Sequence, residues 1–298
     1  MPEVDDDSFA TAVAPMCTVI RDVVAAGTGL VSASAAADSP AMAEIAEQDR
    51  FQSTWWSDPV ETAIAGIAVR LFSAGDALAT YGRAFETTTP PTYAHLPLAR
   101  MALDAASAAY WLAAPVGVDV RVKRSEVLAL ENGKQMKRMP LPAAKAKGAE
   151  VLDRVCGGAS HLGWDASRGD KPHVGGVAVP TPRTLIGDLI DDTTGPGSDL
   201  GDVLWSWLSG VTHGYPWALL QAADRTAAVV SPLGPMQLPF VIRADTVVLI
   251  GLLAARAYAT LVVRHGLFVG WSSSDWDEAH RRLLVAASSA SKALQQPT

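Results

Sequence analysis

The sequence predicts an all-α fold, a multi-helix bundle interrupted by one long loop rich in Gly and Pro. Alanine, which has the highest helix propensity, is abundant throughout the 298 residues. Apolar residues make up 49% of the chain and recur mostly at the three- and four-residue spacing of helices. The one stretch that alternates like a strand, residues 174–179, is short and rich in glycine. We therefore expect helices packed against helices.

The N-terminal region begins with an acidic segment that leads into a helix over about residues 7–26. Glycines end helices readily, and Gly27 and Gly29 are therefore expected to terminate this one. A second, short helix is expected over about residues 40–51. No basic segment resembling a signal peptide precedes them.

The next helix begins at a recognisable capping sequence. Asp58 stands at the N-cap, Pro59 at the first helical position and Glu61 two residues further on. Apolar residues at helical spacing extend this helix to about residue 85. The segment 87–91, which holds three threonines and two prolines, is expected to form a turn.

Three helices are expected in the middle of the chain, because a proline or a pair of glycines follows each apolar-periodic stretch. They cover about residues 95–113, before Pro115; 119–139, before Pro140; and 143–156, before Gly157 and Gly158. A long loop is then expected over 163–182, which is rich in Gly and Pro. Loops of this length are commonly lids or mobile segments.

The last part of the chain alternates between helices and breaks. A short helix is expected over 184–191, followed by a flexible break over 193–198 and a Trp-rich helix over 199–224 that Pro216 kinks. A proline-rich loop over 231–239 precedes two final helices. These cover 243–265 and 274–294, the second with Ser274 as its N-cap.

Composition and charge indicate a cytoplasmic protein with no membrane partner. Residues 1–298 are expected to form one domain, with 1–86 as a candidate N-terminal helical subdomain. The most hydrophobic stretch, 246–263, contains Arg256, which favours a buried core helix over a membrane span. Cys17 and Cys156 lack metal-type spacing and are expected to be free thiols. The net charge of −7 argues against a surface that binds nucleic acid everywhere.

The most unusual stretch is 205–217, which contains three of the nine tryptophans and one of the six histidines. On a helix Ser206, Ser209 and His213 share one face, because they lie three and four residues apart. Trp205 and Trp217 flank this polar stripe. We interpret it as one wall of a pocket inside an apolar bundle.

A second polar group lies on the predicted helix 95–113, which is otherwise apolar nearly all round. Arg100 and Asp104 are four residues apart and suit either an ion pair on the surface or the lining of a cavity. Tyr110 and Trp111 follow on the same helix. Ser209 with His213 also suits nucleophilic catalysis if a third group such as Asp104 or Asp202 orients the imidazole, but a ligand-binding or core histidine is the more common case.

Two other patterns are less specific indications of a functional site. Arg154 and His161 match the Arg and His spacing of HEPN (higher eukaryotes and prokaryotes nucleotide-binding) ribonucleases, with two helix-breaking glycines between them. Asp188, Asp191 and Asp192 suit a magnesium ion by spacing, although an exposed acidic helix end explains them equally well. No nucleotide-binding loop, nucleophile elbow or zinc-protease motif occurs, and we predict no metal and no cofactor.

Three segments together resemble a known group of proteins. They are Leu98-Ala-Arg-Met-Ala-Leu-Asp104, the pair Arg121 and Arg124, and Leu208-Ser-Gly-Val-Thr-His-Gly214. The combination looks like uncharacterised bacterial helical-bundle proteins, some of them distantly HEPN-like. The resemblance covers about residues 98–219. It implies an all-α bundle in which Arg100, Asp104, Ser209 and His213 converge, and it implies no particular reaction.

Our leading hypothesis is a pocket that binds, and in one version transforms, a small anionic or polar molecule. The residues assigned to proton transfer and its support are His213, Ser209 and Asp104. Those assigned to ligand binding are Arg100, Tyr110, Trp111, Arg121, Arg124, Trp205 and Trp217. The loop 163–182 would cover the site.

Two alternatives belong to other functional classes. An RNA-directed protein of HEPN type, a nuclease or a tRNA-handling protein, would use the locally basic segment 121–147. The other alternative is a non-enzymatic interaction protein that forms a homodimer through its apolar helices.

Overall fold

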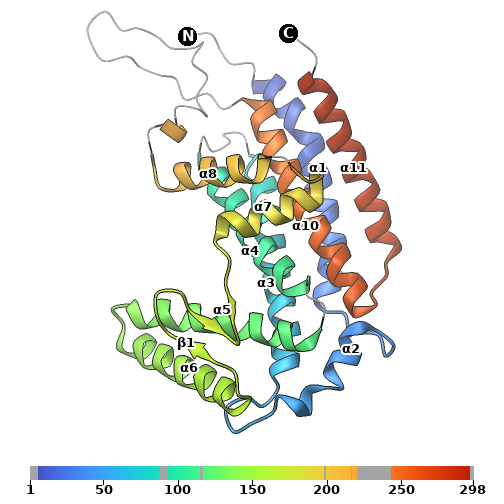
Figure 1. The fold of residues 1–298 in the computed structure, drawn as a ribbon. Coiled ribbons are helices and arrows are strands. Elements are labelled where there is room, and N and C mark those ends of the chain that lie inside the picture. Colours follow the sequence, from blue (N-terminus) through green and yellow to red (C-terminus); the bar gives the residue numbers. More distant parts are fainter. Residues whose placement is uncertain are drawn as a thin grey trace, which may run out of the picture.

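The computed structural model describes residues 6–87, 93–114, 117–197, 199–215, 217–219 and 243–295, which form a helical bundle with a smaller lobe at one end (Figure 1). The bundle helices are α1 (Asp6–Val31), α3 (Pro59–Arg83), α4 (His95–Ala113), α7 (Pro182–Thr194), α8 (Leu200–Thr212), α10 (Ala244–Val269) and α11 (Ser274–Gln295). The lobe contains α5 (Val118–Arg138), α6 (Pro142–His161) and strands β1 (Ala166–Ser167), β2 (His173–Val174) and β3 (Val177–Ala178). Between α1 and α3 lie α2 (Pro40–Ile45) and the 3-10 helix η1 (Gln48–Arg50).

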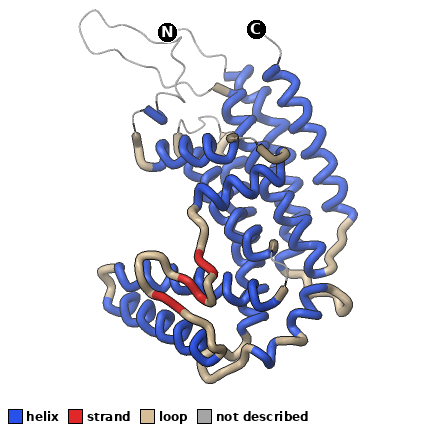
Figure 2. Tube along the Cα trace, viewed as in Figure 1, coloured by secondary structure: helices blue, strands red, loops and turns tan. Residues whose placement is uncertain are grey.

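The all-α prediction is confirmed, since helices dominate the described residues and the strands have two residues each (Figure 2). Within the segment expected to be one long loop, the strands form an antiparallel sheet in the order β1-β2-β3. Gly175 and Gly176 make the turn between β2 and β3 with φ of 54° and 76°. Two consecutive positive φ angles suit a tight hairpin, which glycine adopts without steric cost. The sequence reading missed this hairpin because its strands are so short.

The bundle interior is apolar and centres on α10. Tyr81 of α3 donates a buried hydrogen bond of 2.7 Å to the Val247 carbonyl of α10. On the other side Tyr258 of α10 packs against Gly27, where an added Cβ would lie 2.5 Å from the phenol oxygen. The prediction that Gly27 and Gly29 end the first helix is therefore wrong, because α1 continues to Val31. Gly27 admits the ring of Tyr258 instead of breaking the helix.

The lobe has its own apolar cluster, which includes Phe51, Trp56, Val122 and Val155. Gly157 and Gly158 belong to α6, which continues to His161, so the expected helix break is also wrong. A Cβ at Gly158 would lie 2.1 Å from the Trp56 ring, and one at Gly157 would lie 2.4 Å from the Trp55 ring. The two glycines allow two indoles to lie against the backbone of α6.

Two caps differ from their sequence predictions. Asp58 is the N-cap residue of α3 but makes no capping hydrogen bond with its side chain. Gln48 performs this role: its amide oxygen accepts from the Glu61 N–H at 3.0 Å and its amide nitrogen donates to Asp58. At α11 the capping hydroxyl belongs to Ser273, which accepts from the Trp276 N–H, and Ser274 is the first helical residue.

The Trp-rich helix is shorter than expected, since α8 ends at Thr212 and Gly214 follows with φ of 69°. Three sequence predictions lie wholly or mostly outside the described residues: the turn at 87–91, the kink at Pro216 and the loop at 231–239. The N-terminal helices share one apolar cluster with α4 and α10, and α3 also packs on α5 of the lobe.

Three helical segments are long and apolar enough to cross a membrane by length and composition: Phe9–Val31, Pro59–Arg83 and Ala244–Val269. Two thirds of the most apolar window in α10 is buried inside the protein, as expected for a core helix. The corresponding windows of α1 and α3 are 28% and 39% buried.

Candidate functional site

Helix α8 packs along α7 and across α4, so the Trp-rich segment and the helix that carries Arg100 are neighbours (Figure 1). The contact between α7 and α8 is close because two glycines meet there. A Cβ at Gly201 would lie 2.7 Å from the Cα of Gly187, so the backbones approach this closely because residue 201 has no side chain. A Cβ at Gly187 would meet only Asp202, at 4.0 Å. Residues of both helices line open space beside this crossing.

That space is a groove of two adjoining hollows of about 390 Å³ and 490 Å³. Both are lined by Arg183, Asp199 and Asp202. The first is completed by Thr184, Gly187, Asp188, Asp191 and Gly197. The second is completed by Val203, Ser206, Trp207 and Trp217. We call the two together the α7–α8 groove.

The α7–α8 groove is acidic. Four aspartates and one arginine supply the charged side chains of the first hollow. Arg183 forms an ion pair with Asp202, and its hydrogen bond lowers the pKa of that carboxyl below the usual value. Both side chains are exposed, so the pair is weakly held and open to competition by another charged group.

Two indoles form the other wall of the groove. Trp207 donates from its ring nitrogen to the Ala218 carbonyl at 3.1 Å, which fixes its ring between α8 and the segment after it. Trp217 is 47% exposed and packs over Gly210, where a Cβ would lie 2.7 Å from the ring. Ser206, from the predicted polar stripe, lines the same hollow.

Arg100 and Asp104 form an ion pair on α4, with Nε to Oδ2 at 3.3 Å. Arg100 is mostly buried, and burial raises the pKa of Asp104 although the charge of Arg100 opposes the shift. Arg100 Nη1 and Asp104 Oδ1 are both buried without a hydrogen-bond partner among the described residues. Trp205 Nε1, on the neighbouring helix α8, has none either. Unsatisfied buried polar atoms of this kind are uncommon in folded proteins.

Tyr110 lies against α7 and α10 rather than in the α7–α8 groove. The guanidinium carbon of Arg264 is 4.3 Å from the centre of its ring. Burial first, and the hydrogen bond to Asp192 second, raise the pKa of Tyr110 to about 12.

Arg121 and Arg124 both form hydrogen bonds at the C-terminal end of α4. They donate to the carbonyls of Leu112 and Trp111 respectively, which are among the last carbonyls of that helix. Arg121 is 2% exposed and also binds both carboxylate oxygens of Glu44, at 2.7 and 3.1 Å. The guanidinium carbon of Arg124 lies 4.8 Å from the centre of the Trp111 ring. These contacts give Arg121, Arg124 and Trp111 a structural role in joining the lobe to the bundle.

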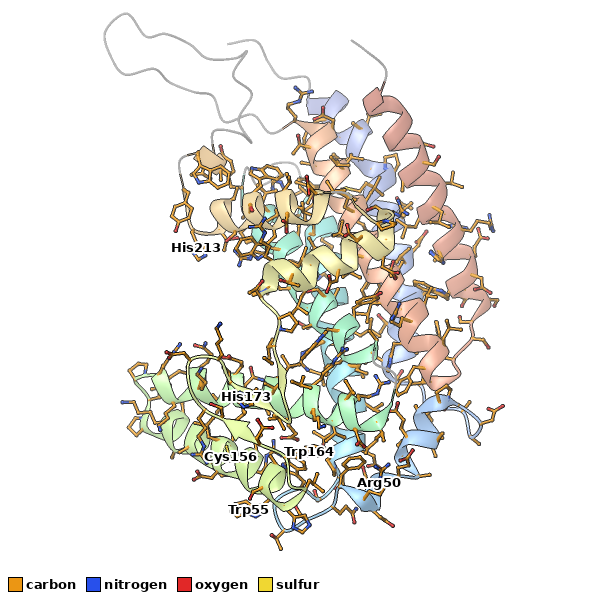
Figure 3. All side chains as sticks on the ribbon, viewed as in Figure 1. Arg50, Trp55, Cys156, Trp164, His173 and His213 are labelled. Atoms are coloured by element: carbon orange, nitrogen blue, oxygen red, sulfur yellow. The ribbon has the colours of Figure 1, made fainter. Side chains whose placement is uncertain are left out.

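His213 lies at the exposed end of α8 and points away from the bundle (Figure 3). Its backbone N–H donates to the Ser209 carbonyl at 3.0 Å, and its ring lies 5.8 Å from that of Tyr215. Neither Arg100 nor His213 is among the residues that line the two hollows of the α7–α8 groove.

The alternative motifs have structural partners of their own. Arg154 binds the buried carboxylate of Glu126 through two hydrogen bonds, while His161 lies exposed at the end of the same helix. Within the described part of the chain, no three His, Cys, Asp or Glu side chains are placed to hold a metal ion. This applies also to Asp188, Asp191 and Asp192, whose spacing suits magnesium.

Sequence reasoning missed Arg183 and Asp199 as lining residues and considered Asp202 only as a partner for His213. The signal that was available is the pair Gly187 and Gly201, since glycines inside two consecutive helices are consistent with a close helix crossing.

Comparisons with known proteins identify no relative. No protein-family model, curated protein or solved structure matches this chain.

Proposed function

We propose that the α7–α8 groove is a ligand site and that its ligand is a small organic cation, such as a polyamine or a quaternary ammonium compound. The single observation that carries this proposal is the combination of four aspartates with two indoles around one groove. Carboxylates attract a cation, and the face of an indole ring binds it through the ring quadrupole. Each hollow lies within the volume range of small-molecule pockets, about 300–1,000 Å³.

The charge of the groove favours a cation over the anionic ligand suggested by Arg100. Arg183 is the one cationic side chain among those lining the groove, and Asp202 already neutralises it. A bound cation would replace Arg183 at the carboxylate of Asp202, at little cost because exposed ion pairs contribute little stability. The proposal is for binding, and it assigns no reaction.

Arg100 and Asp104 are proposed to support the site from behind. They lie on α4, against which α8 packs, and each has a buried polar atom that a water molecule or a ligand group would satisfy. Ser209 and His213 lie further along α8 than the lining residue Ser206. Ser209 and His213 would contact a bound ligand only if the ligand extended beyond the groove.

We also propose that the bundle folds in an aqueous compartment such as the cytoplasm. The support comes from charged groups on the two less buried apolar helices: Arg21 pairs with Glu86, Asp22 pairs with Arg282, and Asp76 is exposed. Ion pairs and charges near the middle of a span are costly in a bilayer.

The RNA-directed alternative has less support. The predicted basic segment 121–147 does not present a continuous basic surface, because Arg121 and Arg124 are engaged in the contacts of α4 and Lys134 donates to the Gly169 carbonyl. A surface that follows a nucleic-acid backbone needs cations available along its length.

The experiment is isothermal titration calorimetry with spermidine and choline as cationic probes and inorganic phosphate as the anionic probe. We expect the cations to bind and phosphate not to bind. Asp202→Asn should weaken cation binding by about fivefold or more, and Trp217→Ala by a similar factor. Arg183→Ala should strengthen it, because Asp202 loses its competing partner.

Two further variants separate the groove from general effects. Gly187→Leu should abolish binding and leave the fold intact, since a Cβ at this position meets only Asp202, at 4.0 Å, and the side chain would fill the first hollow. The control is Asp153→Asn in the lobe, which removes an aspartate outside the groove and should change nothing. Phosphate binding that Arg183→Ala abolishes would overturn the proposal.

A further inference from the structure

The helices of the α5–α6 hairpin pack closely because they touch at two glycines. A Cβ at Gly148 would lie 2.6 Å from the Gly133 carbonyl oxygen, and Leu152 packs beside the same contact. The hairpin extends outward from the bundle, and the turn between its helices lies at its outer end (Figure 1). The hairpin therefore presents residues 137–147, which we call the basic tip, at a fixed place on the surface.

The basic tip carries the basic side chains of the hairpin that the fold leaves available. Lys137, Arg138 and Lys145 are exposed, and none of them makes an ion pair or side-chain hydrogen bond with another residue that the structure describes. Lys147 is exposed and pairs only with Glu150, one turn further along α6. Elsewhere in the lobe Arg121, Arg124 and Arg154 are bound by carbonyls or carboxylates.

Two large apolar side chains are exposed among these cations. Met139 is 44% exposed and Leu141 is 58% exposed. They alternate with Pro140 and Pro142, and proline restricts the backbone of this turn. Apolar side chains held at an exposed turn and surrounded by lysine and arginine suit an interface that is both anionic and apolar.

We propose that the basic tip docks on the surface of an anionic phospholipid bilayer. The cations would contact lipid headgroups, and Met139 and Leu141 would enter the boundary between headgroups and acyl chains. This contact is peripheral and independent of the cation site in the α7–α8 groove. It replaces the expectation from sequence that the protein has no membrane partner.

The distribution of charge over the molecule supports one orientation. Residues 117–179 contain eleven basic and seven acidic residues, a net charge of +4. Since the whole chain has a net charge of −7, the remaining residues carry −11. An anionic surface attracts the lobe and repels the bundle. The field of the whole protein therefore turns the basic tip toward the membrane before contact.

A lipid surface fits the basic tip better than a nucleic acid does. Binding to single strands relies on aromatic side chains that stack on bases, and residues 137–147 contain no aromatic residue. Met139 and Leu141 gain nothing from phosphate contacts, whereas removing their apolar surface from water favours insertion.

The test is co-sedimentation of the full chain with vesicles of phosphatidylcholine alone and of phosphatidylcholine mixed with phosphatidylglycerol. We expect binding only to the mixed vesicles and a decrease with added salt. Each cation near an anionic surface contributes a factor of about five in partitioning, so Lys137→Glu with Arg138→Glu should weaken binding by about 25-fold or more. Met139→Ser with Leu141→Ser should weaken it by about tenfold.

Matched controls carry the same chemical changes elsewhere. Lys171→Glu reverses a charge in the lobe outside the basic tip, and Val285→Ser removes an exposed apolar side chain from α11, and we expect neither to alter vesicle binding. Binding that does not depend on phosphatidylglycerol, or that the tip variants leave unchanged, overturns the proposal. So does tighter binding to a short single-stranded RNA that the charge reversal abolishes and the serine variants preserve.

Discussion

The bundle and the lobe stabilise their interiors in different ways. The bundle buries a broad apolar cluster contributed by helices from both ends of the chain, with few charged groups inside it. The lobe has a smaller cluster and depends on individual contacts: two indoles against two glycines, and the buried carboxylate of Glu126 held by Arg154. A small apolar core contributes less stabilisation, so single contacts matter more in the lobe.

The two regions also differ in how they present charge. The lobe engages several of its cations with carboxylates or carbonyls and leaves Lys137, Arg138 and Lys145 exposed at the outer end of the α5–α6 hairpin. The α7–α8 groove of the bundle gathers carboxylates beside exposed indoles. Local charge in this acidic protein therefore depends on which side chains the fold leaves unneutralised, more than on how many the sequence contains.

The largest expected effect concerns the junction between the two regions. Arg121→Met should destabilise the protein by about 3–5 kcal/mol, because it leaves the Glu44 carboxylate and the Leu112 carbonyl without their buried partner. The guanidinium also lies 4.1 Å from the Phe268 ring of α10, so bundle and lobe should loosen together. Urea unfolding followed by circular dichroism measures the loss. A cost below about 1 kcal/mol would show that the two regions are stabilised separately.

The second prediction compares adjacent glycines within the lobe. Gly158→Ala should cost about 3 kcal/mol, because the added methyl group meets the ring of Trp56, which is 2% exposed and unable to move aside. Gly157→Ala should cost clearly less, since Trp55 is 47% exposed and can rotate toward solvent. Thermal unfolding of both variants gives the difference. Equal costs would contradict the role assigned to the buried indole.

The third prediction concerns acid stability of the bundle. His265 is 3% exposed, and burial together with the charge of Arg121 lowers its pKa from 6.5 to about 4. The unfolded chain therefore binds this proton first as the pH falls. The free energy of unfolding should be unaffected by this group above pH 6.5 and fall by up to about 3 kcal/mol between pH 6.5 and 4.

His265→Leu should reduce that acid sensitivity. Its Nδ1 is buried without a hydrogen-bond partner among the described residues, so an apolar side chain deprives no partner of a bond through that atom. The measurement is unfolding by urea at several pH values for both proteins. Parallel curves for the two would mean that other groups control the acid response.

Some residues of the α7–α8 groove could be predicted from the sequence and others could not. The sequence singled out the segment 205–217, and its members Ser206 and Trp217 line the groove. It also indicated that the helix carrying Arg100 and Asp104 is apolar and buried, and α4 has the expected bounds of His95–Ala113. Arg183 and Asp199 were missed because they line a common hollow only once the close contact at Gly201 brings α7 and α8 together.

Helical periodicity and proline positions act over one or two turns of the chain, so the sequence alone is enough to predict the all-α class and the order of most helices. The role of each glycine depends instead on tertiary packing. Gly27 and Gly158 do not end their helices, since each admits a ring from a distant part of the chain, Tyr258 or Trp56. Charge depends on packing in the same way. Arg121 and Lys137 are both basic residues of the same helix, and packing buries Arg121 against its partners while Lys137 stays exposed at the basic tip.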